Sequence, residues 1–305
     1  MRKKKIKTTD EILMGSSTSR NVFTVFNTIL MIAMTLMALV PLWYIVCMSF
    51  SSSNAVDAGK VTFWPVEFTL HSYEFIMQNK EFYHAFGVSV LRVILGVPIN
   101  LLMCVLMAYP LSKPESRFPG RKIYVWFFLI TMFFDAGIIP TFIVVKYTHL
   151  MNTIWALIVP GCVSVFNMMI LLNFFRDLPT ELEESALLDG AGHGTILFKI
   201  FVPLAKPAIA TLVLFSFVSQ WNSWMDGLMY INDSAKYPLQ TYLQGILTTP
   251  DLNTLTNAQL EMWASTSRRA TNAAQIVITT LPIMLVYPFL QKYFTTGLTM
   301  GSVKG

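Results

Sequence analysis

Charged residues are scarce in this chain. Only 13% of its 305 residues are Asp, Glu, Lys or Arg, whereas 54% are hydrophobic, and the mean hydropathy is +0.55. A soluble domain usually carries about 25% charged residues. Half that charge density cannot cover a water-facing surface over this length. The composition therefore excludes an ordinary soluble protein and indicates a protein of the membrane.

Cysteine and metal-ligand patterns are also scarce. The three cysteines fall in long apolar stretches, where a thiol behaves as a small apolar side chain, and an odd number argues against a disulfide framework. The four histidines, His71, His84, His149 and His193, are scattered along the chain. Since they form no HExxH or other paired ligand spacing, the sequence predicts no metal site.

The chain lacks the loop that cradles nucleotide phosphates. The stretch DGAGHGT at 189–195 has the glycines, but it lacks the Lys that reaches the phosphates in G-x-x-x-x-G-K-[ST]. No Ser, His and Asp arrangement of a hydrolase is visible in the sequence. We therefore expect no catalytic residue and no bound cofactor on this chain.

Long apolar runs are abundant. A helix that crosses a hydrocarbon core of ~30 Å needs roughly 20 apolar residues at 1.5 Å each. Six runs meet this requirement and predict an all-α membrane protein with six transmembrane helices: Val22–Met48, Phe86–Leu111, Ile123–Val145, Ile154–Phe175, Ala205–Met225 and Ala273–Phe294. The first run is too long for the core of a cleaved signal peptide.

The Lys and Arg residues predict the orientation, because cytoplasmic loops keep an excess of them. Most of them fall on one side of the six predicted helices if both termini lie in the cytoplasm of a multi-pass cell-membrane protein. The basic start, MRKKKIK, is expected beside anionic lipid rather than nucleic acid. The expected segments are a basic tail (1–21), a first helix (22–48), an extracellular segment (49–81), a core with five helices (82–294) and a cytoplasmic tail (295–305).

A polar insert separates the fourth and fifth predicted helices. Residues 180–203 read TELEESALLDGAGHGTILFKIFVP. Thr180 and Glu183 fit a capping box, which predicts a short helix that ends at the pair Asp189 and Gly190. A second short helix follows a corner of three glycines. A bent, acidic pair of helices presents backbone that another surface can approach closely, so the insert is predicted to be a docking element.

The insert resembles the cytoplasmic signature of the permease subunits of binding-protein-dependent ABC importers. That signature reads E-A-A, three residues, G, nine residues and I-x-L-P, and here a serine replaces the middle alanine and Val202 replaces the leucine. The positions of interest are Glu184, Ser185, Ala186, Asp189, Gly190, Ile200 and Pro203. Most of the chain from Phe82 onward, including QWNSWMDG and the ending GLTMGSVKG, is similar to carbohydrate permeases of the maltose-type smaller group, in the oligosaccharide branch of Gram-positive bacteria.

The resemblance implies a non-catalytic permease of the type I ABC importer fold, with 180–203 as its coupling helix. It implies that Glu184 contacts a basic residue of the ATPase, that Ala186 faces the ATPase cleft and that Gly190 permits a sharp corner. The implied partners are a second, homologous permease in a heterodimer, two copies of a cytoplasmic ABC ATPase that binds ATP and Mg, and an extracellular or periplasmic sugar-binding protein. The implied function is import of an oligosaccharide or another carbohydrate by alternating access.

Polar residues within the predicted helices are candidates for the translocation path, because polar groups are costly in hydrocarbon. The segment QWNSW is the favoured pore-side stretch. The candidates are Asn100, Asp135, Asn167, Gln220, Trp221, Asn222 and Trp224. The alternatives are hydrogen bonds between helices for the amides, a helix cap for Asp135, and, for Arg92, either snorkelling to the interface or a pore or partner contact.

Two other functional classes compete with the importer. An ion-coupled secondary transporter of a small solute usually has coupling carboxylates near the midplane and repeated halves, but only Asp135 is so placed and no repeat is visible. An intramembrane enzyme would need a nucleophile and a base on facing helices. The outer segment from Asp226 to Thr271 is expected to touch the sugar-binding protein, and the C-terminal tail either reaches the ATPase or is disordered.

Overall fold

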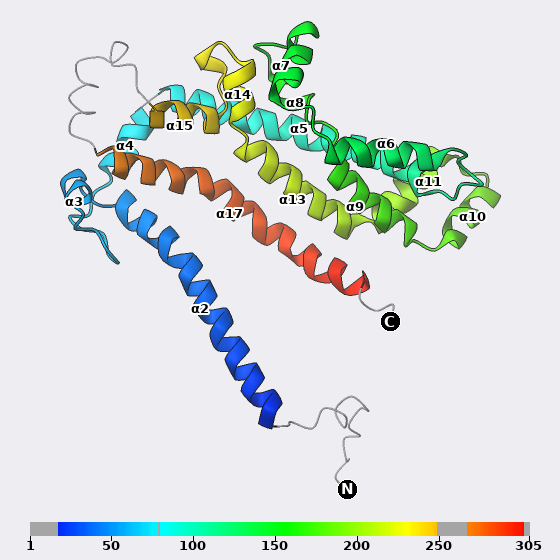
Figure 1. The fold of residues 1–305 in the computed structure, drawn as a ribbon, viewed down its shortest axis with the longest axis horizontal. Helices are drawn as coiled ribbons and strands as arrows, with labels where there is room; N and C mark the ends of the chain where they lie inside the picture. Colours follow the sequence, from blue (N-terminus) through cyan, green and yellow to red (C-terminus); the bar gives the residue numbers. More distant parts are fainter. Residues whose placement is uncertain (1–17, 79, 249–266, 302–305) are drawn as a thin grey trace. The chain divides into compact units, whose positions relative to one another are not determined.

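The computed structural model describes residues 18–78, 80–248 and 267–301 of the 305-residue chain, and all regular structure in these ranges is helical (Figure 1). The all-α class is therefore confirmed. The chain forms two compact units, one of Met1–Ser72 with Ser265–Ala274 and the other of Tyr73–Ala264 with Gln275–Gly305. We describe them separately.

The smaller unit holds α2 (Thr18–Ser49), α3 (Ser53–Asp57) and the first turns of α17 (Arg268–Gly301). The first predicted span is confirmed as a helix, because residues 21–49 are continuous, apolar and long enough to cross a membrane. A small core joins the C-terminal end of α2 to α3 and α17, and it comprises Cys47, Ala55, Val56, Val61 and Ala270.

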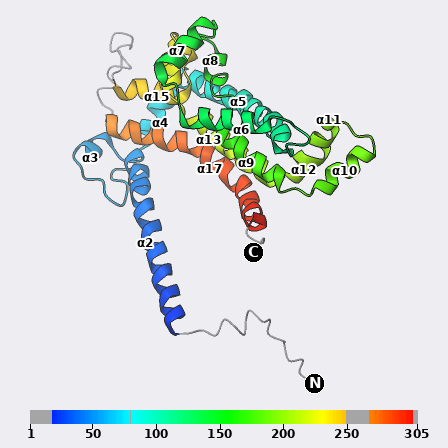
Figure 2. The same ribbon diagram turned by 45° about the vertical axis from the view of Figure 1, so that its right-hand side comes forward.

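The larger unit is built around α5 (Lys80–Ser112), α9 (Val165–Arg176) and α13 (Lys206–Asn222), which pack along one another (Figures 1 and 2). Their contact is apolar, and the side chains with no exposed surface include Cys104, Met168, Leu171, Leu172 and Leu212. The apolar faces of these helices pack against one another, so the three helices form the scaffold that positions the polar groups.

The third predicted span is a broken helix. The helices α6 (Arg121–Phe133) and α7 (Ile138–Tyr147) meet at 114°. Gly137 adopts φ 84° at the break, a conformation that favours glycine. The Asp135 carboxylate accepts a 3.1 Å hydrogen bond from the Gly137 N–H, which forms a turn before α7. Gly137 is the N-cap and no side chain caps α7, so the alternative of Asp135 as a helix cap is wrong.

The fourth predicted span, Ile154–Phe175, is not one helix, which corrects the prediction. It consists of α8 (Ile154–Ile158), an irregular stretch over residues 159–164 and α9. Pro160 and Gly161 interrupt the apolar run and prevent a continuous helix. Among the described residues, three helices are individually long and apolar enough to cross a membrane, or up to five if each sharply bent pair counts as one.

The polar insert consists of α10 (Thr180–Leu188), α11 (His193–Ile196), a π-helical turn (Leu197–Phe201) and α12 (Val202–Leu204). It continues into α13 through a bend of 82°. Gly190, with φ 80°, forms the corner, whereas Gly192 has φ −75° and Gly194 lies inside α11, so the predicted corner of three glycines holds for Gly190 alone. The second helical stretch of the insert ends at Leu204, close to Pro203 as predicted, and it contains a π-helical turn before that residue.

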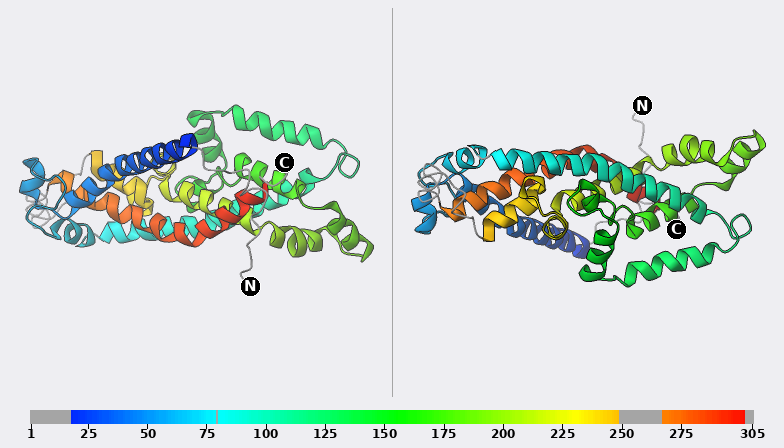
Figure 3. Two further views of the ribbon diagram at one scale, coloured as in Figure 1. Left: turned by 90° about the horizontal axis from the view of Figure 1, so that it is seen from below. Right: turned by 90° about the horizontal axis from the view of Figure 1, so that it is seen from above.

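The remaining elements of the larger unit lie toward the opposite end of α5. They are α4 (His71–Gln78), whose first two residues belong to the smaller unit, α14 (Met225–Tyr230), a 3₁₀ turn (Ser234–Lys236) and α15 (Leu239–Thr248). Figure 3 shows this separation, with the yellow-green insert at one end and the gold α15 toward the other. The predicted fifth span therefore ends at Asn222 rather than Met225, and the helix predicted to end at Phe294 continues to Gly301.

Candidate functional site

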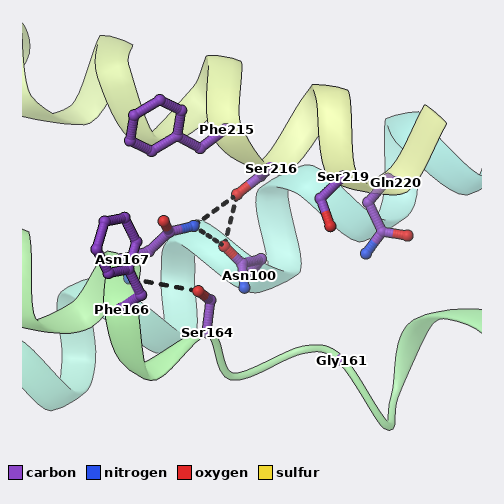
Figure 4. A pocket seen from close by; sticks show the side chains of 9 residues that line it. All are labelled: Asn100, Gly161, Ser164, Phe166, Asn167, Phe215, Ser216, Ser219 and Gln220. Atoms are coloured by element: carbon purple, nitrogen blue, oxygen red, sulfur yellow. Dashed lines mark hydrogen bonds between the residues drawn. The ribbon is translucent and has the colours of Figure 1, made fainter. Parts of the chain in front are cut away.

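A polar cavity of about 290 Å³ opens between α5, α9 and α13 (Figure 4). Its walls combine amide and hydroxyl groups with two aromatic rings, and none of the lining residues is charged. They are Asn100, Gly161, Ser164, Phe166, Asn167, Phe215, Ser216, Ser219 and Gln220. Three residues predicted to lie on the translocation path, namely Asn100, Asn167 and Gln220, thus come together from three helices.

The amides of the cavity wall also tie the helices together. Ser216 Oγ donates to Asn100 Oδ1 at 2.6 Å, and Asn167 Nδ2 donates to Ser216 Oγ at 3.3 Å. Asn100 Nδ2 donates to the Cys162 carbonyl at 3.0 Å. The alternative of hydrogen bonding between helices is therefore present for both asparagines. Because a buried polar group needs such partners, these bonds also fix the shape of the wall.

The two rings of the wall, Phe166 and Phe215, have centroids 6.3 Å apart and are tilted by 36°. Apolar rings beside amides and hydroxyls are the combination expected in a small-molecule site. Sequence reasoning missed both rings and Ser216 and Ser219. The spacing of Ser216 and Gln220, four residues apart on one predicted helix, is the signal that would have found the shared face.

The structure brings only one residue of QWNSW into the cavity wall. Gln220 lines it, whereas Trp221 is buried beside Phe217, with ring centroids 6.1 Å apart, and donates its Nε1–H to the Thr279 carbonyl at 2.9 Å. Asn222 is exposed outside the lining. Trp224 is half-buried outside it as well. Asp135, exposed at the break between α6 and α7, is also not a lining residue.

Arg92 contacts Gln220 but does not itself line the cavity. All five of its N–H groups donate hydrogen bonds. Its Nε donates to Gln220 Oε1 at 2.8 Å. Its two terminal nitrogens donate to both carboxylate oxygens of Asp226 and to the carbonyls of Leu157 and Ser223. With its side chain only 4% exposed, Arg92 does not snorkel outward, so that alternative is wrong. The sequence placed Asp226 in an outer loop and missed this buried ion pair.

Two glycines leave space for the side chains of this cluster. A Cβ added at Gly96 would lie 3.0 Å from the Gln220 side chain, and one added at Gly227 would lie 2.0 Å from Thr241 Oγ1. Asp226 also accepts from Ser223 Oγ and from the Gly227 N–H, both at 2.9 Å. The carboxylate is thereby held rigidly between α14 and Arg92.

A charged cluster anchors the insert at the other end of α5. Glu183 Oε2 lies 2.9 Å from Lys113 Nζ and 3.3 Å from a terminal nitrogen of Arg117. The predicted capping box is therefore wrong. α10 begins after Pro179 without a side-chain cap, because the Glu183 side chain reaches these two cations instead of its own helix start. Sequence reasoning assigned Glu183 no role beyond that cap.

The signature residues of the insert take different positions. Glu184, Ser185, Asp189 and Pro203 are exposed, as is Gly190 at the corner. Two further residues, Ala186 and Ile200, are half-buried against the core of this chain. Glu184 Oε1 has a partner within the chain, a terminal nitrogen of Arg117 at 3.0 Å.

Cofactor and metal chemistry is not indicated by these side chains. Within the described ranges, no three His, Cys, Asp or Glu side chains lie close enough together to hold a metal ion. The prediction that ATP and Mg are bound by a partner chain stays a prediction.

Comparison with known proteins matches residues 89–299 to the family described as binding-protein-dependent transport system inner membrane component. Protein LplC of Bacillus subtilis is 39% identical over 292 residues, which are 96% of this chain and 98% of that protein. The polygalacturonan/rhamnogalacturonan transport system permease protein YtcP of the same organism is 37% identical, over 92% of this chain and 97% of that one.

A solved structure has the same fold. A chain of a bacterial ABC transporter involved in the import of the acidic polysaccharide alginate is 33% identical to this chain and superposes with a TM-score of 0.83, over 92% of this chain and 99% of that one. This chain therefore belongs to the family of binding-protein-dependent transport system inner membrane components, and it is a helical, multi-pass permease subunit of an ABC importer.

Proposed function

We propose that this chain forms one half of the membrane pathway of an ATP-driven importer for an oligosaccharide, and that the cavity between α5, α9 and α13 contacts the sugar during passage. The observation that carries the proposal is the lining of that cavity. It offers amides, hydroxyls and two rings without a charged residue, which suits the hydroxyl groups and apolar faces of a carbohydrate. Relatives named for polygalacturonan and alginate transport support a carbohydrate substrate.

The complete topology belongs to the same proposal. If the broken pair α6 and α7 and the broken pair α8 and α9 each cross the membrane once, the chain has six spans with both termini in the cytoplasm. Irregular backbone at membrane depth is tolerated where protein or a water-filled cavity covers it. The irregular stretch before α9 meets this condition, since Gly161 and Ser164 line the cavity.

The insert is the proposed coupling helix. Its exposed surface carries the acidic Glu184 and the apolar Leu182 and Leu188, which is 89% exposed. A surface that is both acidic and apolar suits a cleft that contains a basic residue, and the family resemblance implies such a cleft in the ATPase. The proposed assembly contains a second, homologous permease and two copies of that ATPase, which would bind the ATP and Mg.

An extracellular sugar-binding protein is the proposed donor of the substrate. The outer segment from Asp226 to Thr271 is the surface we propose for it. The first part of this segment is anchored, because the Leu239 N–H donates to Ser89 Oγ at 2.7 Å and Thr241 Oγ1 donates to the Trp224 carbonyl at 2.8 Å. The tip of the segment and the end of the C-terminal tail lie outside the described residues.

Filling the cavity tests the proposed sugar contact. Ser219→Leu places an isobutyl group in the wall without removing a hydrogen bond of the Asn100 network, so we expect uptake by the reconstituted transporter to fall at least 10-fold. ATP hydrolysis stimulated by the loaded binding protein should persist. The matched control is Thr211→Leu on the same helix, whose hydroxyl bonds only the Pro207 carbonyl of its own helix. Equal uptake by the two variants would contradict the proposed contact.

A further inference from the structure

The insert is joined to the helical bundle by two kinds of route. The covalent route has two links: residues 177–179 connect α9 to α10, and α11, the π-helical turn and α12 lead through a bend of 82° into α13. The second of these links contains a π-helical turn, which is rare and typical of functional sites.

The second route is the ion pair of Glu183 with Lys113. Lys113 directly follows the last residue of α5, and the two side chains are 5% and 9% exposed. Lys113 Nζ also lies 3.9 Å from the ring centroid of Tyr109 and 4.0 Å from that of Phe201. One buried ammonium therefore joins α10, the π-helical turn and the end of α5.

This route leads straight to the cavity. The helix α5 has 33 residues, with Pro98 and Pro110 inside it, and at 1.5 Å each it is about 50 Å long. It carries Asn100 in the cavity wall and Arg92, which bonds Gln220. A displacement of its inner end thus reaches both positions along one continuous helix.

The neighbouring Glu184 differs from Glu183 in exposure. Its pair with Arg117 joins side chains that are 56% and 36% exposed, and exposed ion pairs contribute little. Breaking this pair costs the chain little, so Glu184 remains available to a partner. Glu183 is not available, because its carboxylate is enclosed by its own chain.

From these contacts we propose that Glu183 is a positioning residue for transport: its buried ion pair with Lys113 transmits the movement of α10 to α5 and so to the cavity. The inference rests on the proposed function and assigns different roles to the two neighbouring glutamates. Glu184 faces the ATPase, whereas Glu183 carries the resulting displacement into the membrane helices.

Three variants of the assembled transporter test the inference in proteoliposomes. Glu183→Gln keeps the size of the side chain and removes its charge, and Lys113→Met keeps the bulk of the lysine stem. Each is expected to lower the sugar transported per ATP hydrolysed at least 10-fold while hydrolysis continues. Lys113→Arg retains the positive charge, so its ratio of sugar transported to ATP hydrolysed should lie within about 2-fold of the wild type. A bulky residue without the charge should not restore this ratio.

Glu181→Gln is the matched control on the same helix. It removes an exposed carboxylate and should leave the ratio of transport to hydrolysis unchanged. The double variant Glu183→Gln with Lys113→Met should be no worse than Glu183→Gln alone, because that change already removes the ion pair with Lys113.

The outcomes separate the inference from the proposed function. If wild type couples uptake to ATP hydrolysis and Glu183→Gln and Lys113→Met do so equally well, the inference is wrong and the proposed function stands. Additive losses in the double variant would also overturn the inference. If the wild-type assembly shows no ATP-dependent uptake of any oligosaccharide, the proposed function fails.

Discussion

Arg92 places a positive charge inside the larger helical unit, where an unpaired ion is strongly unfavourable. Its five N–H donors all have acceptors, two of which are the carboxylate oxygens of Asp226. The charge is therefore neutralised and fully hydrogen-bonded, which offsets the loss of hydration. The same cluster holds Gln220 in the cavity wall.

Removing Arg92 should destabilise the chain strongly. Arg92→Met leaves Asp226 buried without its counter-ion, and breaking a buried pair in this way costs about 3–5 kcal/mol. We expect a lower yield of the folded permease and a lower midpoint in thermal unfolding of the detergent-solubilised complex. Lys122→Met is the control, since its ion pair with Glu115 joins side chains that are 76% and 47% exposed. A complex with Arg92→Met that is as stable as this control would show that the pair is dispensable.

Lys113 is expected to make coupling sensitive to alkaline pH. Burial lowers the pKa of its ammonium below the ordinary 10.5, and Glu183 only partly opposes this effect. As the pH rises, the folded chain loses this proton before the unfolded chain does. The contribution of this group to the stability of the folded state therefore increases with pH up to 10.5. The ion pair disappears in the same window.

Transport per ATP is therefore expected to fall on the alkaline side at a pH below 10.5, because the Lys113 cation that pairs with Glu183 is lost. Lys113→Arg should extend the coupled range to higher pH, because a guanidinium stays protonated. The measurement is uptake and hydrolysis by both forms in proteoliposomes across the alkaline range. Superimposable pH profiles would mean that Lys113 does not titrate in this window.

At the scale of elements, the breaks between helices determine how the helices are oriented. The turn between α10 and α11 depends on Gly190, which has φ 80°, whereas Gly192 has φ −75° and ψ 159°. The first conformation favours glycine, and the second is open to any residue. The two glycines, which look equivalent in the sequence, therefore have different roles.

This difference predicts a contrast between two substitutions. Gly190→Val should reorient α10, because a β-branched residue at this φ is strained by about 1–3 kcal/mol, and uptake should become uncoupled from ATP hydrolysis. Gly192→Val should be nearly silent, since a Cβ at Gly192 meets no atom within 4 Å. Uptake and hydrolysis measured side by side distinguish the two, and equal behaviour of both variants would contradict this account of the corner.

At the scale of the whole molecule, the chain is a permease subunit without a phosphate-binding loop. Energy must then come from a partner, as the importer proposal states, or from an ion gradient. The carboxylate expected for ion coupling, Asp135, is engaged by the Gly137 N–H in a turn. The cavity lining carries no carboxylate either, so an ion-coupled transporter is not favoured.

Uptake is therefore expected to follow ATP rather than ion gradients. In cells that carry the complete transport system, depletion of ATP should stop uptake, because hydrolysis drives the proposed conformational cycle. An ionophore that collapses the proton and sodium gradients while ATP is maintained should leave uptake largely unchanged. The reverse pattern, with loss of uptake under the ionophore alone, would support the secondary transporter.

Composition and apolar runs predicted an all-helical membrane protein because hydrophobic length is a local property, and the family signature marked the insert because its spacing lies within one stretch of chain. The cavity, the Arg92 and Asp226 pair and the Glu183 and Lys113 pair were beyond such reasoning. Each joins residues 49 or more positions apart, and a buried polar group finds its partner only when helices pack. The sequence alone thus determined the class and marked the polar insert, while tertiary packing decided which polar residues face the cavity and which brace the fold.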